Sequence, residues 1–351
     1  YAKKLALNFT APPRDTFAEL EDCSQEPSTV AINAGLNIFA PRHMMLFGLY
    51  DLLGNPNHPH GFSADTWGFS SVSSIETTMI AGGVSSGYLD DDCWLDLAYA
   101  GGERSGIVMY KNRGDQLGFE VMSLLDDDPG GLFTGVAMAD LNGDYRKEIL
   151  FGNLKQKKMP VYSENEDGFY SRIADFSMSR STYGISFGDV NGDGFPDIYL
   201  AHWFSGNVLT APAFWRNNSG EEVEYYDAES GLSQNNLLQD WNFSPAFYDA
   251  NDDGSSDLLL ASDFGTSVVM QNDGSGAFDN VTDRDVINDN NGMGSALGDY
   301  DNDGDLDWFV TSIYVPELAN SGWGGTGNKL YENVSEPGGV IQFDDVLSLI
   351  H

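Results

Sequence analysis

A nine-residue acidic loop occurs five times along this chain, and no other feature of the sequence limits the fold as strongly. The loops begin at residues 88, 140, 189, 249 and 299. They therefore recur about every 50 residues, and a period of this size is typical of architectures in which each repeat is one supersecondary unit. The shared pattern is D-x-[DN]-x-D-G-x-x-D, and the loop Asp299-Tyr-Asp-Asn-Asp-Gly-Asp-Leu-Asp307 matches it at every position.

Positions 1, 3, 5 and 9 of each loop bring oxygen-bearing side chains to one side of a tight turn. This donor set predicts Ca²⁺, which takes about six to eight oxygen ligands in a flexible geometry, whereas Mg²⁺ needs a stricter octahedron. Zinc would favour His or Cys. Asp, Asn and Gly also favour solvated turns on their own, but five loops in register favour calcium over that simpler interpretation. The predicted ligands of the four to five expected ions are Asp90, Asp92, Asp96, Asp140, Asn142, Asp144, Glu148, Asp189, Asn191, Asp193, Asp197, Asp249, Asn251, Asp253, Asp257, Asp299, Asp301, Asp303 and Asp307.

The five loops do not match the pattern equally well. Loop 140–148 has Tyr145 at position 6 and Glu148 at position 9, and loop 88–96 has Tyr88 at position 1 and Cys93 at position 6. We therefore expect calcium most firmly in the last three loops and least firmly in loop 88–96. The last three loops also have glycine at position 6, where the chain must turn sharply: Gly194, Gly254 and Gly304.

The residues around the loops predict β-hairpins rather than EF-hands. An EF-hand needs Glu at position 12 and a helix on each side of the loop. Small residues precede the loops, and short apolar runs such as 197–201 and 257–261 follow them, which predicts buried strands on both sides. Position 12 is apolar in the last four loops, where it is Phe151, Leu200, Leu260 and Val310.

The stretch from Gly292 to Thr311, Gly-Met-Gly-Ser-Ala-Leu-Gly-Asp-Tyr-Asp-Asn-Asp-Gly-Asp-Leu-Asp-Trp-Phe-Val-Thr, resembles the FG-GAP (VCBS) repeat of integrin α-chain propellers. With the signature-like stretch 270–282, the chain more specifically resembles the secreted cartilage acidic protein family, whose repeats often accompany an ASPIC/UnbV segment. The resemblance covers about residues 80–351 and implies a loop between the first two strands of each blade. It also implies that the backbone carbonyl of position 7 joins the four side chains on the ion.

The resemblance implies an all-β fold, a β-propeller of four-stranded blades, and we expect one propeller domain over residues 1–351. Seven blades would use the chain completely, and six is the alternative. Residues 1–79 are expected to form a degenerate N-terminal blade and a closure strand. The five repeats are expected at about 80–130, 131–180, 181–238, 239–290 and 291–351.

The charge of the chain excludes some partners. The formal net charge is −37 with only 17 Lys and Arg, so nucleic acid and anionic membranes are poor partners, and no run of about 20 apolar residues predicts a membrane span. The first residue, Tyr1, and the lack of a visible signal peptide suggest a mature or trimmed form. Modest calcium sites fill outside cells, so we expect an extracellular or cell-surface protein. Cys23 and Cys93 are either one disulfide or two buried thiols.

No nucleophile elbow, P-loop or dinucleotide fingerprint is present. The favoured hypothesis is a calcium-binding propeller that serves as a binding or adhesion module for an extracellular protein or glycan. The alternatives are a propeller enzyme acting on polysaccharide and a structural subunit of a surface assembly that associates through calcium. Five tryptophans could form a carbohydrate-stacking surface, although most are expected in blade cores: Trp67, Trp203, Trp215, Trp241 and Trp323.

Overall fold

The computed structural model describes residues 4–7, 83–90, 92, 94–100, 107–114, 118–124, 132–154, 158–177, 181–203, 213–227, 229–232, 241–315, 317 and 325–346. Regular structure in these ranges consists of β-strands without an α-helix. A search of the same ranges for a helix that could span a membrane finds none.

The strands form five antiparallel sheets, which we number blades 1 to 5 in chain order. Blade 1 contains β2 (Gly83–Gly87), β3 (Asp96–Ala100), β4 (Ile107–Asn112) and β5 (Phe119–Leu124). Blade 2 contains β6 (Phe133–Ala139), β7 (Glu148–Asn153), β8 (Lys158–Glu164) and β9 (Tyr170–Ser177). Blade 3 contains β10 (Thr182–Gly188), β11 (Asp197–His202), β12 (Phe214–Asn218) and β13 (Glu222–Tyr225), with β1 (Lys4–Ala6) added at its edge. Blade 4 contains β14 (Asn242–Tyr248), β15 (Asp257–Ser262), β16 (Val268–Asn272) and β17 (Phe278–Asn280). Blade 5 contains β18 (Gly292–Gly298), β19 (Asp307–Ser312), β20 (Lys329–Asn333) and β21 (Phe343–Asp345).

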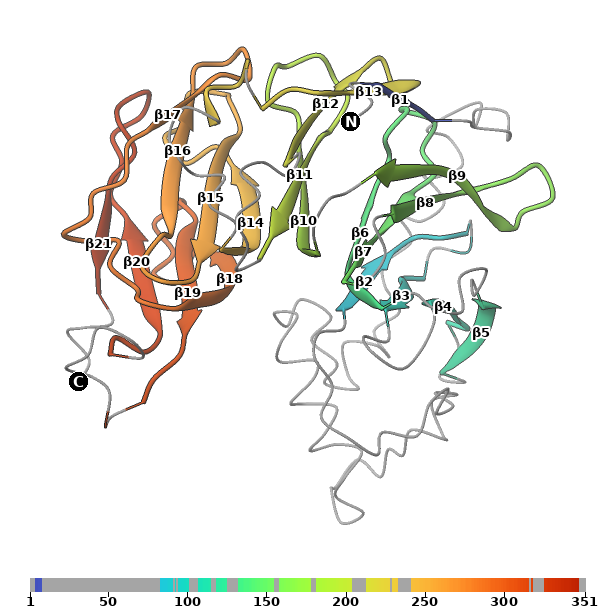
Figure 1. Cartoon of the computed structure of the whole chain (residues 1–351), viewed down its shortest axis with the longest axis horizontal. Helices are drawn as coiled ribbons and strands as arrows, with labels where there is room; N and C mark the ends of the chain where they lie inside the picture. The colour runs from blue at the N-terminus through green and yellow to red at the C-terminus, as the bar shows by residue number, and fades with distance from the viewer. Residues whose placement is uncertain are drawn as a thin grey trace.

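The blades stand side by side in chain order around an arc (Figure 1). Neighbouring blades contact each other through their first strands, β2 with β6, β6 with β10, β10 with β14 and β14 with β18. Each blade is a four-stranded meander in which every strand pairs with the next one along the chain. The predicted all-β architecture of propeller-type blades is therefore confirmed, while the number of blades in the whole chain stays a prediction.

Each acidic loop joins the first two strands of one blade, and we name these loops 1 to 5 (88–96, 140–148, 189–197, 249–257 and 299–307). The predicted hairpins are confirmed. Position 9 is always the first residue of the second strand, and it pairs with the last residue of the first strand. The pairs are Gly87 with Asp96, Ala139 with Glu148, Gly188 with Asp197, Tyr248 with Asp257 and Gly298 with Asp307.

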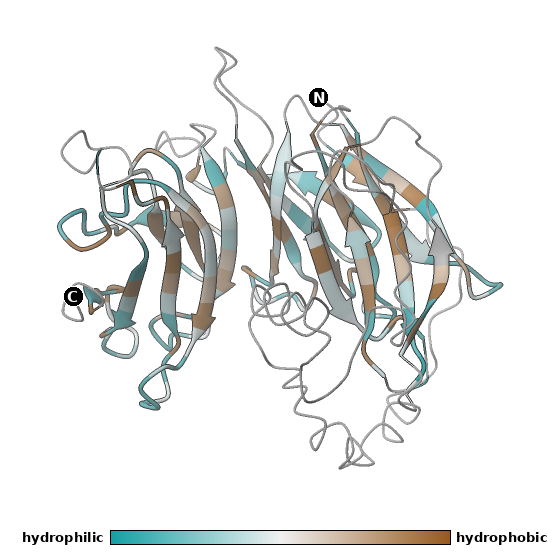
Figure 2. Ribbon diagram, turned by 90° about the horizontal axis from the view of Figure 1, so that it is seen from below, coloured by the Kyte–Doolittle hydropathy of each residue, from teal (hydrophilic) through white to brown (hydrophobic). Residues whose placement is uncertain are grey.

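The hydrophobic core lies between adjacent blades. The second strands of blades 2, 3 and 4 are buried at all six positions, which explains their continuous apolar runs. Their side chains alternate between two cores. In β15, Leu258 and Leu260 pack towards blade 3, while Leu259 and Ala261 pack towards blade 5. Figure 2 shows this banding of hydrophobic residues along the strands. Each leucine buried in this way contributes about 1.5–3 kcal/mol, so the blades stabilise one another.

The first described strand adds to blade 3, and the closure strand expected within residues 1–79 stays a prediction. Residues Lys4–Ala6 pair with β13 at the outer edge of blade 3, where Lys4 also forms an ion pair with Glu222 at 2.6 Å. The expected degenerate blade lies almost entirely outside the described residues. The same is true of four individual residues singled out above: Cys23, Trp67, Cys93 and Trp323.

Candidate metal centres

All five loops share one hydrogen-bonded frame. In every loop the position 5 carboxylate accepts a bond from the backbone N–H of position 7, as Asp303 does from Asp305 at 3.0 Å. In loops 2 to 5 the position 1 carboxylate also accepts from positions 5 and 6; in loop 4 Asp249 accepts from Asp253 at 3.1 Å and from Gly254 at 2.8 Å. The sequence pattern thus folds the loop so that its carboxylates are held by its own amides.

Two positions of each of loops 2 to 5 have a positive φ angle. Position 6 is left-handed at the three predicted glycines, with φ of 89°, 87° and 107°, and Tyr145 adopts the same conformation at 66° despite its Cβ. Position 4 is left-handed as well, which sequence reasoning missed. The Asn and Gly enrichment at that position was the signal. The position 4 residues are Gly143, Gly192, Asp252 and Asn302.

The position 9 carboxyl is buried in every loop. Asp257 shows the common arrangement, in which its Oδ2 accepts from the Ala250 N–H at 2.9 Å and its Oδ1 accepts from the Asn272 N–H at 2.8 Å. Burial raises the pKa of Asp257 to about 6, and the nearby carboxylates of Asp249 and Asp253 add to that shift. Burial likewise raises the pKa of three other position 9 groups, to about 6 in Asp96, about 8 in Glu148 and about 7 in Asp197.

An asparagine at or next to the end of the third strand connects each of blades 3, 4 and 5 to the blade before it. Its backbone N–H binds the position 9 carboxylate of its own blade, and its side-chain amide donates to the position 2 carbonyl of the preceding loop. For Asn333 the acceptors are Asp307 at 2.9 Å and Ala250 at 2.9 Å. The other inter-blade donors are Asn217 to Leu141 at 2.7 Å and Asn272 to Val190 at 2.7 Å. The resemblance includes this asparagine in its signature, but sequence reasoning gave it no role.

Blades 1 and 2 replace parts of this connection. In blade 2 the hydroxyl of Ser163 donates to Glu148 at 2.9 Å, in the place of the asparagine N–H. The hydroxyl of Tyr170 lies 3.4 Å from the carbonyl of Leu89 in loop 1, in the place of the asparagine amide. In blade 1 the side-chain amide of Asn112 donates to the carbonyl of position 8 of its own loop. The bonds therefore run through all five described blades.

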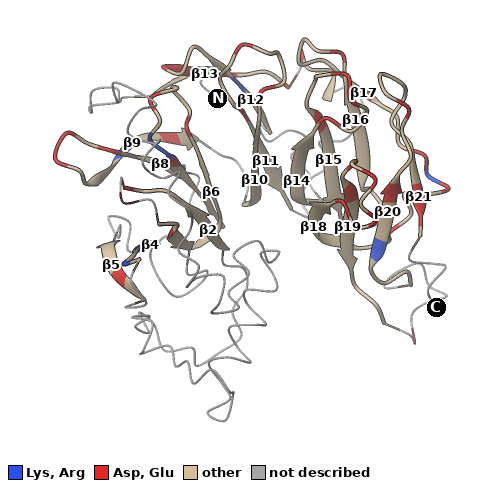
Figure 3. Ribbon diagram, turned by 180° about the vertical axis from the view of Figure 1, so that it is seen from behind, with Lys and Arg blue, Asp and Glu red and all other residues tan. Residues whose placement is uncertain are grey.

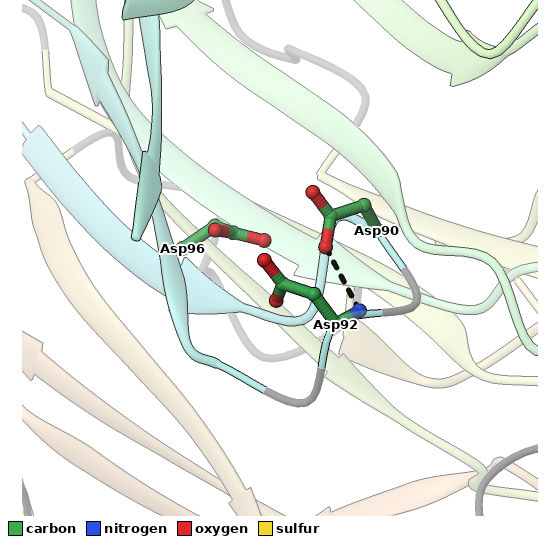
Figure 4. A group of neighbouring side chains, drawn as sticks. All are labelled: Asp90, Asp92 and Asp96. Atoms are coloured by element: carbon green, nitrogen blue, oxygen red, sulfur yellow. Dashed lines mark hydrogen bonds between the residues drawn. The ribbon is translucent and has the colours of Figure 1, made fainter. Parts of the chain in front are cut away.

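Two loops gather three carboxylates each, with ligand atoms within 4.8 Å of one another; among the described residues no other acidic group of three comes this close. In loop 5 these are Asp299, Asp301 and Asp307, without Asp303. Oxygens that share one calcium at about 2.3–2.6 Å can be up to roughly 5 Å apart, so this spacing fits the ion. In loop 1 the group is Asp90, Asp92 and Asp96, which Figure 4 shows around one space.

Loop 4 contains a buried side-chain oxygen that accepts no hydrogen bond, which points independently to a cation. Asn251 at position 3 is only 2% exposed, and its side-chain amide donates to the Gly339 carbonyl of blade 5 at 2.6 Å. Its Oδ1 has no hydrogen-bond partner. A buried amide oxygen without a donor is costly, and a hard cation would satisfy it. The residues of loop 4 therefore fit calcium.

Loop 1 differs because a basic side chain enters its acidic group. The ammonium of Lys111, from β4, hydrogen-bonds to Asp90 Oδ2 and lies 3.1 Å from Asp92 Oδ2. Among the described residues, no Lys or Arg forms an ion pair with a carboxylate of loops 2 to 5 that is a predicted ligand. Lys111 is the second residue that sequence reasoning missed. Asp and Glu occur in every blade and are more frequent there than Lys and Arg (Figure 3).

The tryptophans divide into core and surface. Trp215 is 2% exposed and packs between blades 2 and 3. Trp203 and Trp241 are half-buried and pair as an isolated bridge, with ring centroids 5.6 Å apart. Their neighbours complete an aromatic patch at the end of blades 3 and 4 away from the acidic loops. The patch consists of Tyr183, Trp203, Trp241, Phe243 and Phe264.

One comparison with known proteins identifies the repeat. The model of the FG-GAP-like repeat matches residues 89–151 and 249–310, which include loops 1, 2, 4 and 5. A search of curated proteins finds no sequence similar to this chain.

Solved structures with a related architecture are distant. A lectin of Agrocybe aegerita that recognises non-reducing terminal N-acetylglucosamine aligns with a TM-score of 0.42 at 15% identity, over 76% of this chain and 66% of the lectin chain. The biofilm matrix protein Bap1 of V. cholerae aligns with a TM-score of 0.40 at 16% identity, over 79% of this chain and 41% of the Bap1 chain. A GH43 β-1,3-galactosidase aligns with a TM-score of 0.35 at 10% identity, over 71% of this chain and 56% of the galactosidase chain. The chain thus spans less than two thirds of each of these chains. The match shows FG-GAP-like repeats at residues 89–151 and 249–310, and the described sheets, each with an acidic loop between its first two strands, are arranged as blades of a β-propeller-type fold.

Proposed function

We propose that this protein is a calcium-binding β-propeller that serves as an extracellular binding module. The observation that carries the calcium proposal is the buried Oδ1 of Asn251, which lacks a donor at a predicted ligand position. The three close carboxylates of loop 5 support it independently. Loops 2 to 5 would hold the ions through the side chains at positions 1, 3, 5 and 9.

The proposed role of calcium is structural. Two carboxylates about 4 Å apart repel each other by roughly 4 kcal/mol at an effective dielectric constant of about 20. Bound calcium supplies the positive charge that offsets this repulsion. The loop amides hold each ordered loop to its own sheet, and the inter-blade asparagines hold it to the next sheet, so an ordered loop stabilises both sheets. Millimolar calcium outside cells would fill such sites, which supports a secreted or cell-surface location.

Calcium binding is tested by measuring bound metal and heat of binding on the full chain. We expect at least three calcium ions per chain after gel filtration in calcium buffer, and a calorimetric titration of the EDTA-treated protein that saturates at the same number. Magnesium at equal concentration should not replace them. A chain without bound calcium in both measurements would refute the proposal.

The aromatic patch is the proposed ligand face, and a neutral glycan is its proposed ligand. The rings of Trp203 and Phe243 are stacked with an interplanar angle of 25°, and Phe264 is 51% exposed. Aromatic surface is therefore available beside the first residues of β10 and β14. Aromatic rings supply large contact area at a binding site, and a net charge of −37 disfavours anionic ligands. Trp203 is fixed by a 3.0 Å bond from its Nε1 to Asp263, so the patch is pre-organised.

A glycan array with the calcium-loaded protein tests this face. Phe264→Ala should abolish binding to the recognised glycan class, while the calcium content and melting temperature stay near those of the wild type. Tyr314→Ala is the matched control, since Tyr314 is 61% exposed and lies outside the patch. If no glycan binds, or if Phe264→Ala binds as the wild type does, the ligand is instead a protein or another surface binds it.

A further inference from the structure

Loop 1 has the same acidic group as a calcium site, but its cation is part of the chain. We propose that the ammonium of Lys111 is the resident cation of loop 1 and that this loop does not bind calcium. The proposal rests on the proposed calcium binding of the other loops. It concerns the ligands predicted at Asp90, Asp92 and Asp96.

The contacts of Lys111 place it among the ligand positions. Its Nζ bonds to Asp90 at position 3 and lies 3.1 Å from Asp92 at position 5. The oxygens of these two groups and of Asp96 lie within 4.8 Å of one another, so the ammonium lies against two of the three carboxylates that an ion in this loop would bind. The three side chains of the ion pairs are only 21–33% exposed, so water screens them less than it would at an open surface.

The rest of loop 1 is also unsuited to calcium. Position 1 is Tyr88, whose side chain is 45% exposed and offers no carboxylate. The amides of positions 5 and 7 bind Asp90 and Asp92 at 3.0 Å. The bond to position 5 occurs in all five loops, but loop 1 lacks the two bonds that a position 1 carboxylate accepts in loops 2 to 5.

The equivalent side chains of blades 3, 4 and 5 form no ion pair with the predicted ligands of their loops. Each directly precedes the asparagine whose N–H binds the position 9 carboxylate, as Lys111 does. Arg216 lies over the ring of Tyr226 at 5.1 Å. Gln271 donates to the Gly339 carbonyl at 3.0 Å, and Glu332 accepts from the Tyr300 hydroxyl at 3.0 Å. A lysine thus occurs at this position only in the described blade whose loop lacks the position 1 Asp.

The first experiment measures calcium per chain in the wild type and in Asp92→Asn. We expect the same number of ions in both, because loop 1 contributes none. A loss of one ion in Asp92→Asn would overturn the proposal. A wild type without any calcium would instead refute the proposed function, so the two failures can be told apart.

The second experiment compares melting temperatures in EDTA and in millimolar calcium. Lys111→Met should lower the melting temperature in EDTA by several degrees, and calcium should restore at least half of this loss, because the three carboxylates then accept an ion. Lys329→Met is the matched control, since it breaks the ion pair of Lys329 with Asp345 outside the acidic loops and calcium should not restore its loss. Equal melting of Lys111→Met and wild type in EDTA would overturn the proposal.

A third variant tests the design of the loop directly. Tyr88→Asp with Lys111→Gln supplies the missing ligand and removes the resident cation. It should bind one calcium more than the wild type in the same buffer. An unchanged number of ions in this folded variant would show that Lys111 is not what separates loop 1 from the calcium loops.

Discussion

Loop 1 and loop 5 lie at the two ends of the described array and solve the same electrostatic problem in different ways. Both hold a buried position 9 carboxylate with two backbone amides, and both gather three carboxylates within 4.8 Å. Loop 1 contains Lys111, whereas none of the described basic side chains pairs with the acidic group of loop 5. The position 9 carboxylate is therefore held by the same two kinds of backbone bond with and without a basic side chain beside it.

This difference shows what the acidic pattern does and does not report. The pattern reports a hairpin with a defined loop, because the amide bonds and the left-handed residues depend on the loop residues themselves. We propose that the presence of an ion depends also on the strand that faces the loop.

Removal of calcium should affect the two ends of the array unequally. EDTA should lower the melting temperature by more than about 10 °C, since each ion bound only to the folded state adds about 2.7 kcal/mol at a hundredfold excess over its Kd. Hydrogen exchange should then increase in β18 and β19 and change little in β2 and β3. Equal loss of protection at both ends would contradict the comparison.

Substitution of the position 5 carboxylate should separate the loops in the same way. Asp303→Ala should cost about 2–3 kcal/mol in calcium and much less in EDTA, because its effect depends on the ion. Asp92→Ala should cost about 1 kcal/mol in both buffers, as expected for a partly exposed ion pair. Denaturant unfolding measures both values. A calcium-dependent cost for Asp92→Ala would break the comparison.

The connecting asparagines give a smaller contrast. Asn333→Ala should destabilise the fold by about 1–3 kcal/mol, because the buried carbonyl of Ala250 in the preceding blade loses its donor. Asn112→Ala should cost less, since its amide bonds at 3.2 Å to a carbonyl of its own loop. The exposed Asn288 is the control, and Asn288→Ala should be within about 0.5 kcal/mol of the wild type. Equal costs at Asn333 and Asn112 would show that the inter-blade bond adds nothing.

Asp227 is a buried carboxyl outside the loops, and it serves as the reference for a buried carboxyl without a cation. Asp227 accepts from the Phe214 N–H at 2.6 Å and from the Tyr225 hydroxyl at 2.7 Å, and burial raises its pKa to about 6. The folded state therefore binds this proton more tightly than the unfolded state does. Its contribution to stability is present below a pH of about 4 and is lost as the pH rises through 6. Asp227→Asn should remove this dependence.

The melting temperature of the wild type relative to Asp227→Asn should accordingly fall by about 2–4 °C between pH 4.5 and 7.5 in millimolar calcium. A constant difference between the two proteins across this range would show that Asp227 does not titrate in the folded state. Asp227 could then not serve as the reference for the buried carboxyls of the loops.

The fold could be predicted from the sequence because the loop, the strand periodicity and the repeat length agree. Loop 5 alone specifies a turn between two strands, and the apolar run after it specifies a strand, in which Trp308 and Val310 are buried against blade 4. The place of Lys4–Ala6 could not be predicted, since three residues without a clear pattern carry no information on their partner strand.

The candidate site could be predicted only in part. Each ligand position was visible as an acidic residue at fixed spacing. The role of Lys111 was not visible, because it lies 15 residues beyond the end of its loop and meets the loop only when β4 pairs with β3. Asn251 shows the same limit, since its unpartnered Oδ1 results from a bond between its side chain and blade 5.

The connecting asparagines also have a consequence for the way the protein is produced. Asn217-Asn-Ser and Asn333-Val-Ser are acceptor sequons for N-glycosylation. In the folded chain both asparagines are buried, and the amide nitrogen that a glycan would modify is the atom that donates to the preceding blade. A secretory pathway that attaches glycans before folding would place a sugar where two blades must meet. A host without this modification leaves both amides free to connect the blades.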